Sequence, residues 1–289
     1  MKLYTNQQGK LIDTTAEAGL ASRLGWWNSI VSLDIDGDTD MDYVVGNFGL
    51  NTKYQASPDH PVLLYYGDFG NTGGKQLIEA EYESDVLFPV RGKSCSTRAM
   101  PFLAEKFQTY AQFAKGSLQD IYSEKSLKDA TRFEVNNLES GVLINDGRGH
   151  FAFRPLPRVA QIAPVFGIVA TEANGDGYRD LLLVQNFFPT QPETGRMDVG
   201  VGLLLLGTSE GEFTPLSPLA SGLLVPGDAR SLIVGDFSGD SLPDFVVGMN
   251  DSAVKSFRHL PLGGGSGGET LPKGSLVSVY LRGTPGNPS

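Results

Sequence analysis

Three segments of the chain carry oxygen-bearing side chains at the same spacing. Each is a nine-residue stretch with acidic, amide or hydroxyl side chains at positions 1, 3, 5 and 9 and glycine at position 4. We name them loop one (residues 34–42), loop two (172–180) and loop three (236–244). Positions 1, 3, 5, 7 and 9 are Asp34, Asp36, Asp38, Asp40 and Asp42 in loop one, Glu172, Asn174, Asp176, Tyr178 and Asp180 in loop two, and Asp236, Ser238, Asp240, Leu242 and Asp244 in loop three.

This density of oxygen ligands indicates cation binding. Carboxylates so close in sequence repel one another unless a cation neutralises them. Ca²⁺ accepts six to eight hard oxygen ligands in loose geometry. The residue at position 7 differs among the loops, as expected if it offers only its backbone carbonyl. The sequence therefore predicts up to three Ca²⁺ sites, with the fifteen residues above as candidate metal ligands.

The spacing excludes an EF-hand. That motif also begins with alternating aspartates, but it requires a bidentate Glu at position 12 and flanking helices. Position 12 is Val45, Leu183 or Val247, each within an apolar run. A fourth stretch, residues 68–76, has the same length but only one carboxylate, Asp68, and lacks ligands at positions 3 and 9. We predict no metal there.

The elements that position the loops are short strands. Each loop lies between two runs rich in Val, Ile and Leu, which predicts a hairpin of buried strands. Further hairpins are expected over 3–12, 62–80, 141–153 and 202–214, some with Asp-Gly or Gly-containing turns. Loop hairpins and these further hairpins together recur every 60 to 70 residues, as between Glu172 and Asp236. A loop hairpin and the hairpin after it give four strands, the content of one β-propeller blade.

We therefore predict an all-β fold, a partial β-propeller of roughly four blades over residues 1–259 with a small helical insertion at 98–131. In the insertion, Thr109 and Gln112 form the sequence pattern of a capping box. Residues 260–273 are a glycine-rich linker. Residues 274–289 contain one alternating strand, which we expect to be a lone strand opening a truncated domain.

The loop pattern, Asp-x-Asp-Gly-Asp-x-x-x-Asp before an apolar strand and Asn, resembles the FG-GAP/VCBS repeat family, as in integrin α-subunit propellers. The opening at Leu3–Leu20 resembles the cartilage acidic protein-like, ASPIC/UnbV branch of that family, in its bacterial form. Segments 100–114 and 193–207 are similar to members of the same branch, and Val279–Ser289 resembles the start of an ASPIC/UnbV domain. The chain accordingly looks like a fragment.

The resemblance implies a Ca²⁺-stabilised propeller that is exported and serves as a non-catalytic module for ligand binding or adhesion. Its implied location is extracellular, at the cell surface or periplasmic, although no apolar h-region follows Lys2 and we therefore expect no signal peptide in this chain. The partner would be a protein or a glycan. The alternative is a carbohydrate-active enzyme on the same scaffold, such as a polysaccharide lyase, which should gather Lys, Arg, His or Tyr around a groove near Ca²⁺.

Composition and motifs exclude other classes. A net charge of −10 repels a phosphate backbone, so nucleic acid is not an expected partner. The apolar runs are too short for a membrane-spanning helix. Gly207–Gly211 fits Gly-x-Ser-x-Gly, but a strand rather than a helix is expected after it, so Ser209 is no nucleophile. Cys95 has no identifiable base. No catalytic residues are therefore expected.

Overall fold

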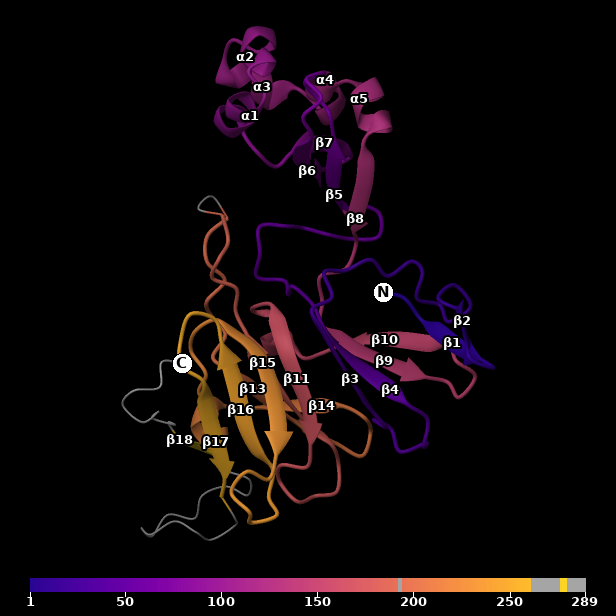
Figure 1. Cartoon of the computed structure of the whole chain (residues 1–289), viewed down its shortest axis with the longest axis vertical. Coiled ribbons are helices and arrows are strands. Elements are labelled where there is room, and N and C mark those ends of the chain that lie inside the picture. The colour runs from indigo at the N-terminus through magenta and orange to yellow at the C-terminus, as the bar shows by residue number, and fades with distance from the viewer. Residues whose placement is uncertain (192–193, 261–275, 280–289) are drawn as a thin grey trace. The chain divides into compact units, whose positions relative to one another are not determined.

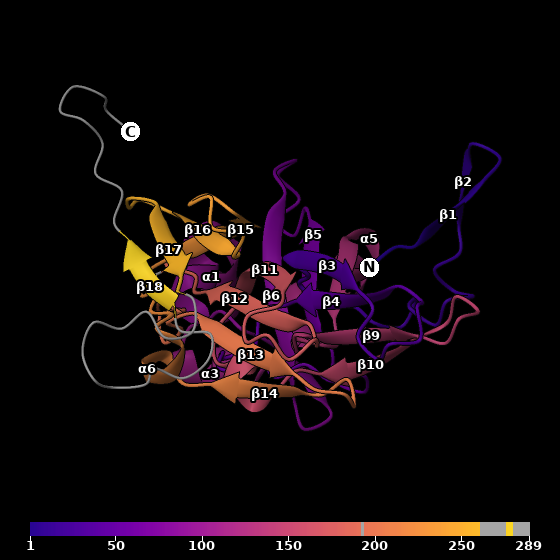
Figure 2. The same ribbon diagram turned by 90° about the horizontal axis from the view of Figure 1, so that it is seen from below.

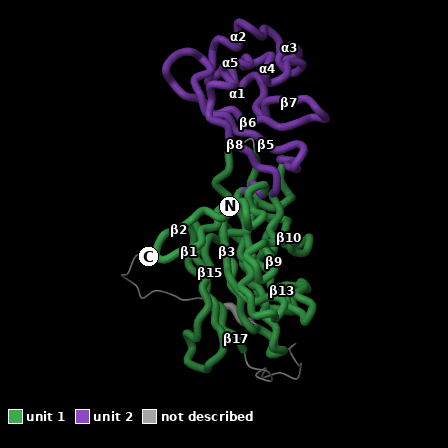
Figure 3. Tube along the Cα trace, turned by 90° about the vertical axis from the view of Figure 1, so that its right-hand side faces the viewer, with its two compact units in different colours: residues 1–22, 26–53, 138–289 green, residues 23–25, 54–137 purple. Residues whose placement is uncertain are grey.

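Antiparallel β-sheets make up most of the described chain. The computed structural model describes residues 1–191, 194–260 and 276–279. These residues form four four-stranded sheets, one two-stranded sheet and six α-helices of four to seven residues. The predicted all-β class is confirmed at this level. The chain separates into two units: residues 1–22, 26–53 and 138–289 form unit 1, and residues 23–25 and 54–137 form unit 2 (Figure 3).

In three sheets of unit 1, the strands lie side by side in the order in which they occur along the chain (Figure 1). The first sheet contains β3 (Ser29–Leu33), β4 (Asp42–Gly46), β9 (Gly141–Asn145) and β10 (Phe151–Pro155). The second contains β11 (Val165–Thr171), β12 (Asp180–Gln185), β13 (Leu203–Gly207) and β14 (Phe213–Leu216). The third contains β15 (Ala229–Gly235), β16 (Asp244–Met249), β17 (Lys255–His259) and β18 (Leu276–Val279). The predicted hairpins at 141–153 and 202–214 are confirmed.

The second sheet is buried on both faces. Alternate residues of a strand point to opposite faces. Leu181 and Leu183 of β12 therefore pack in the core shared with the first sheet, whereas Leu182 and Val184 pack in the core shared with the third. This two-sided burial explains the unbroken apolar sequence of β12. The first strands also lie side by side, since β11 is in contact with both β3 and β15 (Figure 2).

A two-stranded hairpin begins unit 1. Strand β1 (Tyr4–Gln7) pairs with β2 (Lys10–Asp13), as predicted for residues 3–12. After it, Ala18 and Leu20 pack against Val45 of the first sheet. Unit 1 also contains the 3₁₀ helix η1 (Arg158–Gln161) and the helix α6 (Pro218–Ser221).

Unit 2 has a sheet of different strand order, β7-β6-β5-β8. Its strands are β5 (Val62–Gly67), β6 (Gln76–Glu83), β7 (Val86–Pro89) and β8 (Thr131–Val135), and the β5–β6 hairpin is the one predicted for 62–80. The helices α1 (Lys93–Ala99), α2 (Phe102–Lys106), α3 (Tyr110–Lys115), α4 (Leu118–Tyr122) and α5 (Glu124–Asp129) follow β7. Leu103, Phe113 and Ile121 of these helices pack with Leu63 and Ile78 of the sheet.

The predicted helical insertion is present with shifted limits. The helices begin at Lys93 rather than 98 and end at Asp129, because β8 already starts at Thr131. Thr109 and Gln112 form the predicted capping box, with mutual hydrogen bonds of 3.1 and 3.0 Å. None of the described helices has the length and apolar character needed to cross a membrane.

The whole of residues 54–137 interrupts the first sheet in sequence. Strands β4 and β9 pair directly, with Val44 opposite Val142, although unit 2 lies between them in the chain. When unit 2 is left out, the interval from Asp34 to Glu172 becomes similar to the interval from Glu172 to Asp236. The insertion is therefore larger than the predicted helical segment and includes a sheet of its own.

The predicted lone strand is wrong. Residues 276–279 form β18, which pairs antiparallel with β17 and completes the third sheet, with Leu276 opposite His259. The alternating pattern identified a strand, but a strand's partner is set by tertiary pairing that the local sequence does not encode. The linker at 260–273 and the end at 280–289 lie outside the described residues, apart from residue 260. Assignment of 274–289 to a further domain stays a prediction.

Candidate metal centre

Each acidic loop connects the first two strands of its sheet and has the same hydrogen-bonded frame. The carboxylate at position 1 accepts hydrogen bonds from the backbone N–H groups of positions 4 and 6. The two distances are 2.8 and 3.0 Å for Asp34, 2.7 and 2.7 Å for Glu172, and 2.7 and 2.9 Å for Asp236. The longer Glu172 therefore reaches the same donors as the aspartates. The repeat inferred from spacing is a repeat of local structure.

The backbone turns left-handed at two positions of every loop. Position 4 is glycine with φ of 78–79° in all three loops, as the sequence suggests. Position 6 also has positive φ, with values of 75° at Thr39, 91° at Gly177 and 67° at Ser241. Because Thr and Ser rarely adopt this conformation, their sequence gives no signal for it. These two left-handed residues are the ones whose N–H groups donate to the position 1 carboxylate.

The aspartate at position 9 anchors each loop to its sheet. Asp42, Asp180 and Asp244 are buried, with at most 4% of each residue exposed. One carboxylate oxygen accepts from the N–H of position 2, at 2.9, 2.7 and 3.1 Å respectively. The other accepts from a residue at the end of the third strand of the sheet: Asn145, Gly207 and His259. The sequence did not reveal this second contact, because the donors lie far away along the chain.

Burial changes the acidity of two of these aspartates. Desolvation raises the pKa of Asp42 against the lowering effect of its hydrogen bonds from Asn145 and Ile35. It raises the pKa of Asp180 to about 6, again against two backbone hydrogen bonds and with small repulsion from Glu172 and Asp176. A nearby divalent cation would favour the ionised form of both carboxylates. Loops one and two therefore each hold a buried acid whose charge is costly without a cation.

Loop one brings three carboxylates to one point. An oxygen of each of Asp34, Asp36 and Asp42 lies within 4.8 Å of the other two. Two oxygens bound to one Ca²⁺ at 2.3–2.6 Å can be at most about 5.2 Å apart, so these three can share an ion. Asp38 lies outside this group, and one of its oxygens accepts a 2.8 Å hydrogen bond from the N–H of Asp40. The donor set fits a hard divalent cation.

Loop two keeps the frame without such a group of carboxylates in the described residues. The side-chain amide of Asn174 donates to Asp176 at 2.9 Å, so two predicted ligands bind each other. Asp176 also accepts from the N–H of Tyr178 at 2.9 Å, the contact that Asp38 makes in loop one. Cation binding at loop two therefore requires the Asn174 amide to turn its oxygen towards the ion.

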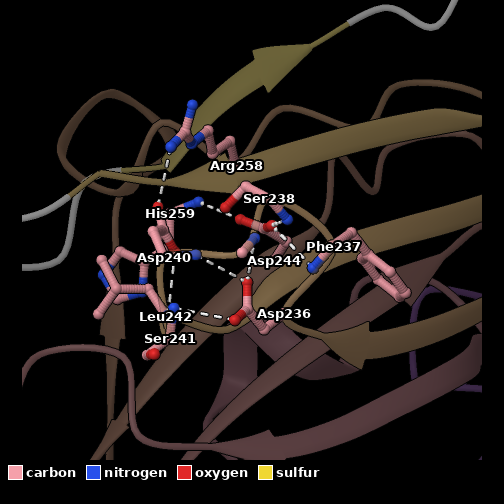
Figure 4. Close-up of polar contacts among 10 residues, drawn as sticks. Asp236, Phe237, Ser238, Asp240, Ser241, Leu242, Asp244, Arg258 and His259 are labelled. Carbon is pink, nitrogen blue, oxygen red and sulfur yellow. Dashed lines mark hydrogen bonds and ion pairs between the residues drawn. The ribbon is translucent and has the colours of Figure 1, made fainter.

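Loop three contains a competing positive charge (Figure 4). The Arg258 guanidinium lies 3.0 Å from Asp240 Oδ2, while Asp240 Oδ1 accepts from the N–H of Leu242. The Leu242 hydrogen bond and then Arg258 lower the pKa of Asp240. Ser238 contributes its N–H to Asp244 at 2.8 Å. The spacing of ligands within the loop gives no sign of Arg258, which lies outside the loop on β17.

The fourth stretch, residues 68–76, has a related frame with different chemistry. Asp68 accepts from the N–H groups of Gly73, Thr72 and Gly70, and these hydrogen bonds, that of Gly73 most, lower its pKa. At position 9, Gln76 Oε1 accepts from the N–H of Phe69 at 2.9 Å, as the aspartates do elsewhere. The Gln76 side-chain amide thus accepts the same hydrogen bond as the aspartates but carries no negative charge. The absence of a metal here stays a prediction.

A polar cleft of about 620 Å³ adjoins loop one within unit 1. Its walls include Asp34 and Asp36 from loop one, Tyr178 and Arg179 from loop two, and Ser209 from the β13–β14 turn. The candidate cation site therefore borders a hollow large enough for a small ligand.

Comparison of the chain with protein-family models and with curated proteins gives no match. The resemblance to FG-GAP/VCBS repeats therefore stays a prediction from the residues of the loops.

Proposed function

We propose that this chain is a calcium-binding β-propeller module of the FG-GAP/VCBS kind, in the ASPIC/UnbV branch. Its role is to bind an extracellular or cell-surface ligand, a protein or a glycan, without catalysis. The observation that carries the proposal is the carboxylate group of loop one. Three oxygens within 4.8 Å have the spacing and hardness that Ca²⁺ requires.

The propeller arrangement is supported by the three equivalent sheets. Each has the same strand order, with its acidic loop between the first two strands. The first strands β3, β11 and β15 are neighbours, as the inner strands of successive blades are around a propeller axis. The sheet of unit 2 differs in strand order and is not counted among these blades.

The lyase alternative has one observation in its favour. Tyr178 and Arg179 line the cleft beside loop one, which is where such an enzyme would place them. No histidine or lysine is among the described lining residues, and a lyase needs a positioned base. Binding is therefore the better supported function.

Calcium titration tests the proposal. The full chain is freed of metal with a chelator, and Ca²⁺ is added during calorimetry and during thermal unfolding. We expect binding heat with up to three sites and a higher melting temperature. A ligand that binds only the folded state at a hundredfold excess over its Kd stabilises it by about 2.7 kcal/mol. Mg²⁺, which prefers strict octahedral geometry, should bind more weakly. Absence of both heat and stabilisation would refute the proposal.

A further inference from the structure

Within the described residues, the cleft beside loop one contains polar side chains that have no hydrogen-bond or ion-pair partner. In the described residues, the carboxylate of Asp36, the phenol of Tyr178, the guanidinium of Arg179 and the hydroxyl of Ser209 all line the cleft. None of these four side-chain groups makes a hydrogen bond or an ion pair with another described residue. The Asp36 carboxylate also belongs to the carboxylate group of loop one. No described residue therefore uses the hydrogen-bonding capacity of these four side chains, and a ligand can.

The backbone around these side chains is held on three sides. Glu172 fixes Gly177 and Asp176 fixes Tyr178, each through a hydrogen bond to the backbone N–H. Asp180 ties the end of loop two to the start of the β13–β14 turn by accepting from Gly207 at 2.9 Å. Gly211 of that turn lies against Ile35 of loop one, since a Cβ at Gly211 would be 3.3 Å from the Ile35 side chain. The cleft is therefore formed before a ligand arrives, which lowers the entropy cost of binding.

The mixture of groups selects the ligand chemistry. Asp36 accepts hydrogen bonds, Arg179 donates them, and the hydroxyls of Tyr178 and Ser209 do both. An anion would meet the carboxylates of Asp34 and Asp36, and a cation would meet Arg179. Sugar hydroxyls both donate and accept hydrogen bonds, so they can donate to Asp36 and accept from Arg179 without bringing a charge into the cleft. Tyr178 is 44% exposed and offers a ring for stacking against a pyranose face.

We propose that this cleft binds a neutral sugar, held by Arg179, Tyr178 and Ser209 on one side and by loop one on the other. Vicinal hydroxyls would also complete the coordination of Ca²⁺ held by Asp34 and Asp36. That calcium-dependent part rests on the proposed function, whereas the contacts to Arg179 and Tyr178 do not.

Saturation-transfer NMR on the full chain tests the proposal, with glucose, galactose, mannose and fucose as probes and glucuronate as the charged comparison. We expect at least one neutral sugar to bind with a Kd near the millimolar range and more tightly when Ca²⁺ is present. Arg179→Ala and Tyr178→Ala should each weaken binding at least fivefold. The matched controls Arg148→Ala and Tyr110→Ala change exposed residues outside the cleft and should have no effect.

The outcomes separate the two proposals. Calcium binding measured on the same samples, together with no transfer to any neutral sugar, overturns the sugar site and leaves the metal function standing. Sugar binding that Arg179→Ala and Tyr178→Ala do not weaken, or binding of glucuronate alone, also overturns it. Sugar binding lost in both variants but unaffected by Ca²⁺ supports the cleft and overturns its calcium-dependent part.

Discussion

The Arg258 guanidinium lies 3.0 Å from Asp240 Oδ2, at the position where loop three should offer a ligand to a cation. An arginine placed there supplies part of the positive charge that Ca²⁺ would bring. Both side chains are partly exposed, at 49% for Arg258 and 23% for Asp240, so the pair itself adds little to stability. Its larger effect is on cation binding, because the arginine repels an incoming ion and occupies one of its ligands.

Removing this competitor should strengthen calcium binding at loop three. An exposed ion pair is weak, so Arg258→Ala should tighten the Kd of this site by no more than about fivefold. Calorimetry in an Asp36→Ala, Asp176→Ala background isolates the site of loop three. Arg148→Ala, which removes an exposed arginine from the β9–β10 turn, is the control and should leave the Kd unchanged. An unchanged Kd in Arg258→Ala would show that the arginine does not compete.

Asp36→Ala should weaken calcium binding at loop one without disturbing the metal-free fold. Asp36 shares the carboxylate group, yet no described N–H donates to it, unlike Asp34 with its bonds from Gly37 and Thr39. We expect an unchanged melting temperature without Ca²⁺ and a smaller rise with it, with at least tenfold weaker binding, equal to about 1.4 kcal/mol.

Two further variants serve as comparisons for Asp36→Ala. Asp34→Ala should lower the melting temperature even without metal, because two backbone donors lose their acceptor. Asp59→Ala, an exposed aspartate outside the loops, should change neither curve. If Asp36→Ala retains the full calcium-induced rise, loop one is not a cation site.

The stability of the calcium-free protein should fall as the pH rises from about 4 to 7. The pKa of Asp180 is raised from 3.8 to about 6 in the folded state, so the protonated form favours folding. This contribution is full below pH 4 and is lost as the pH passes through 6, and it amounts to at most about 3 kcal/mol. Asp13 and Asp146, with pKa values of about 2, act only at lower pH.

Denaturant unfolding across this pH range checks the effect. Asp180→Asn should be less stable overall, because one of the donors Ala173 and Gly207 then faces an amide N–H₂ group, but its stability should change less with pH. Saturating Ca²⁺ should also reduce the slope of the wild-type protein if the ion favours the ionised carboxylate. Equal slopes for wild type and Asp180→Asn without metal would contradict the raised pKa.

Thr39→Gly should stabilise the protein. Thr39 has a φ of 75°, a conformation that costs a side-chain-bearing residue roughly 1–2 kcal/mol. Glycine removes that cost but adds about 0.5–1 kcal/mol of backbone entropy, so the net gain is between about 0 and about 1.5 kcal/mol. The converse change Gly177→Thr, at the same position of loop two, should destabilise. Thermal unfolding measures both, and Thr214→Gly within β14 controls for the entropy of glycine.

The sequence determined the local units of this protein. Alternation and apolar runs identified the hairpins, and Thr109 with Gln112 identified a helix start, because these signals depend on residues a few positions apart. The spacing of oxygen ligands in loops one, two and three likewise showed the repeat, since positions 1, 4 and 9 carry out their roles within a single loop. Only position 6 escaped notice, because Thr39 and Ser241 give no sign of their positive φ.

Tertiary structure decided what depends on distant residues. Because β4 pairs with β9, residues 54–137 are an insertion between two neighbouring strands of one sheet. Because β18 pairs with β17, the last described strand completes the third sheet. Asn145, Gly207 and His259 anchor the loops from remote strands, and Arg258 reaches Asp240 only because β17 runs beside β16. Hydrogen bonding and charge act through space, so residues far apart in the sequence decide how three similar loops differ.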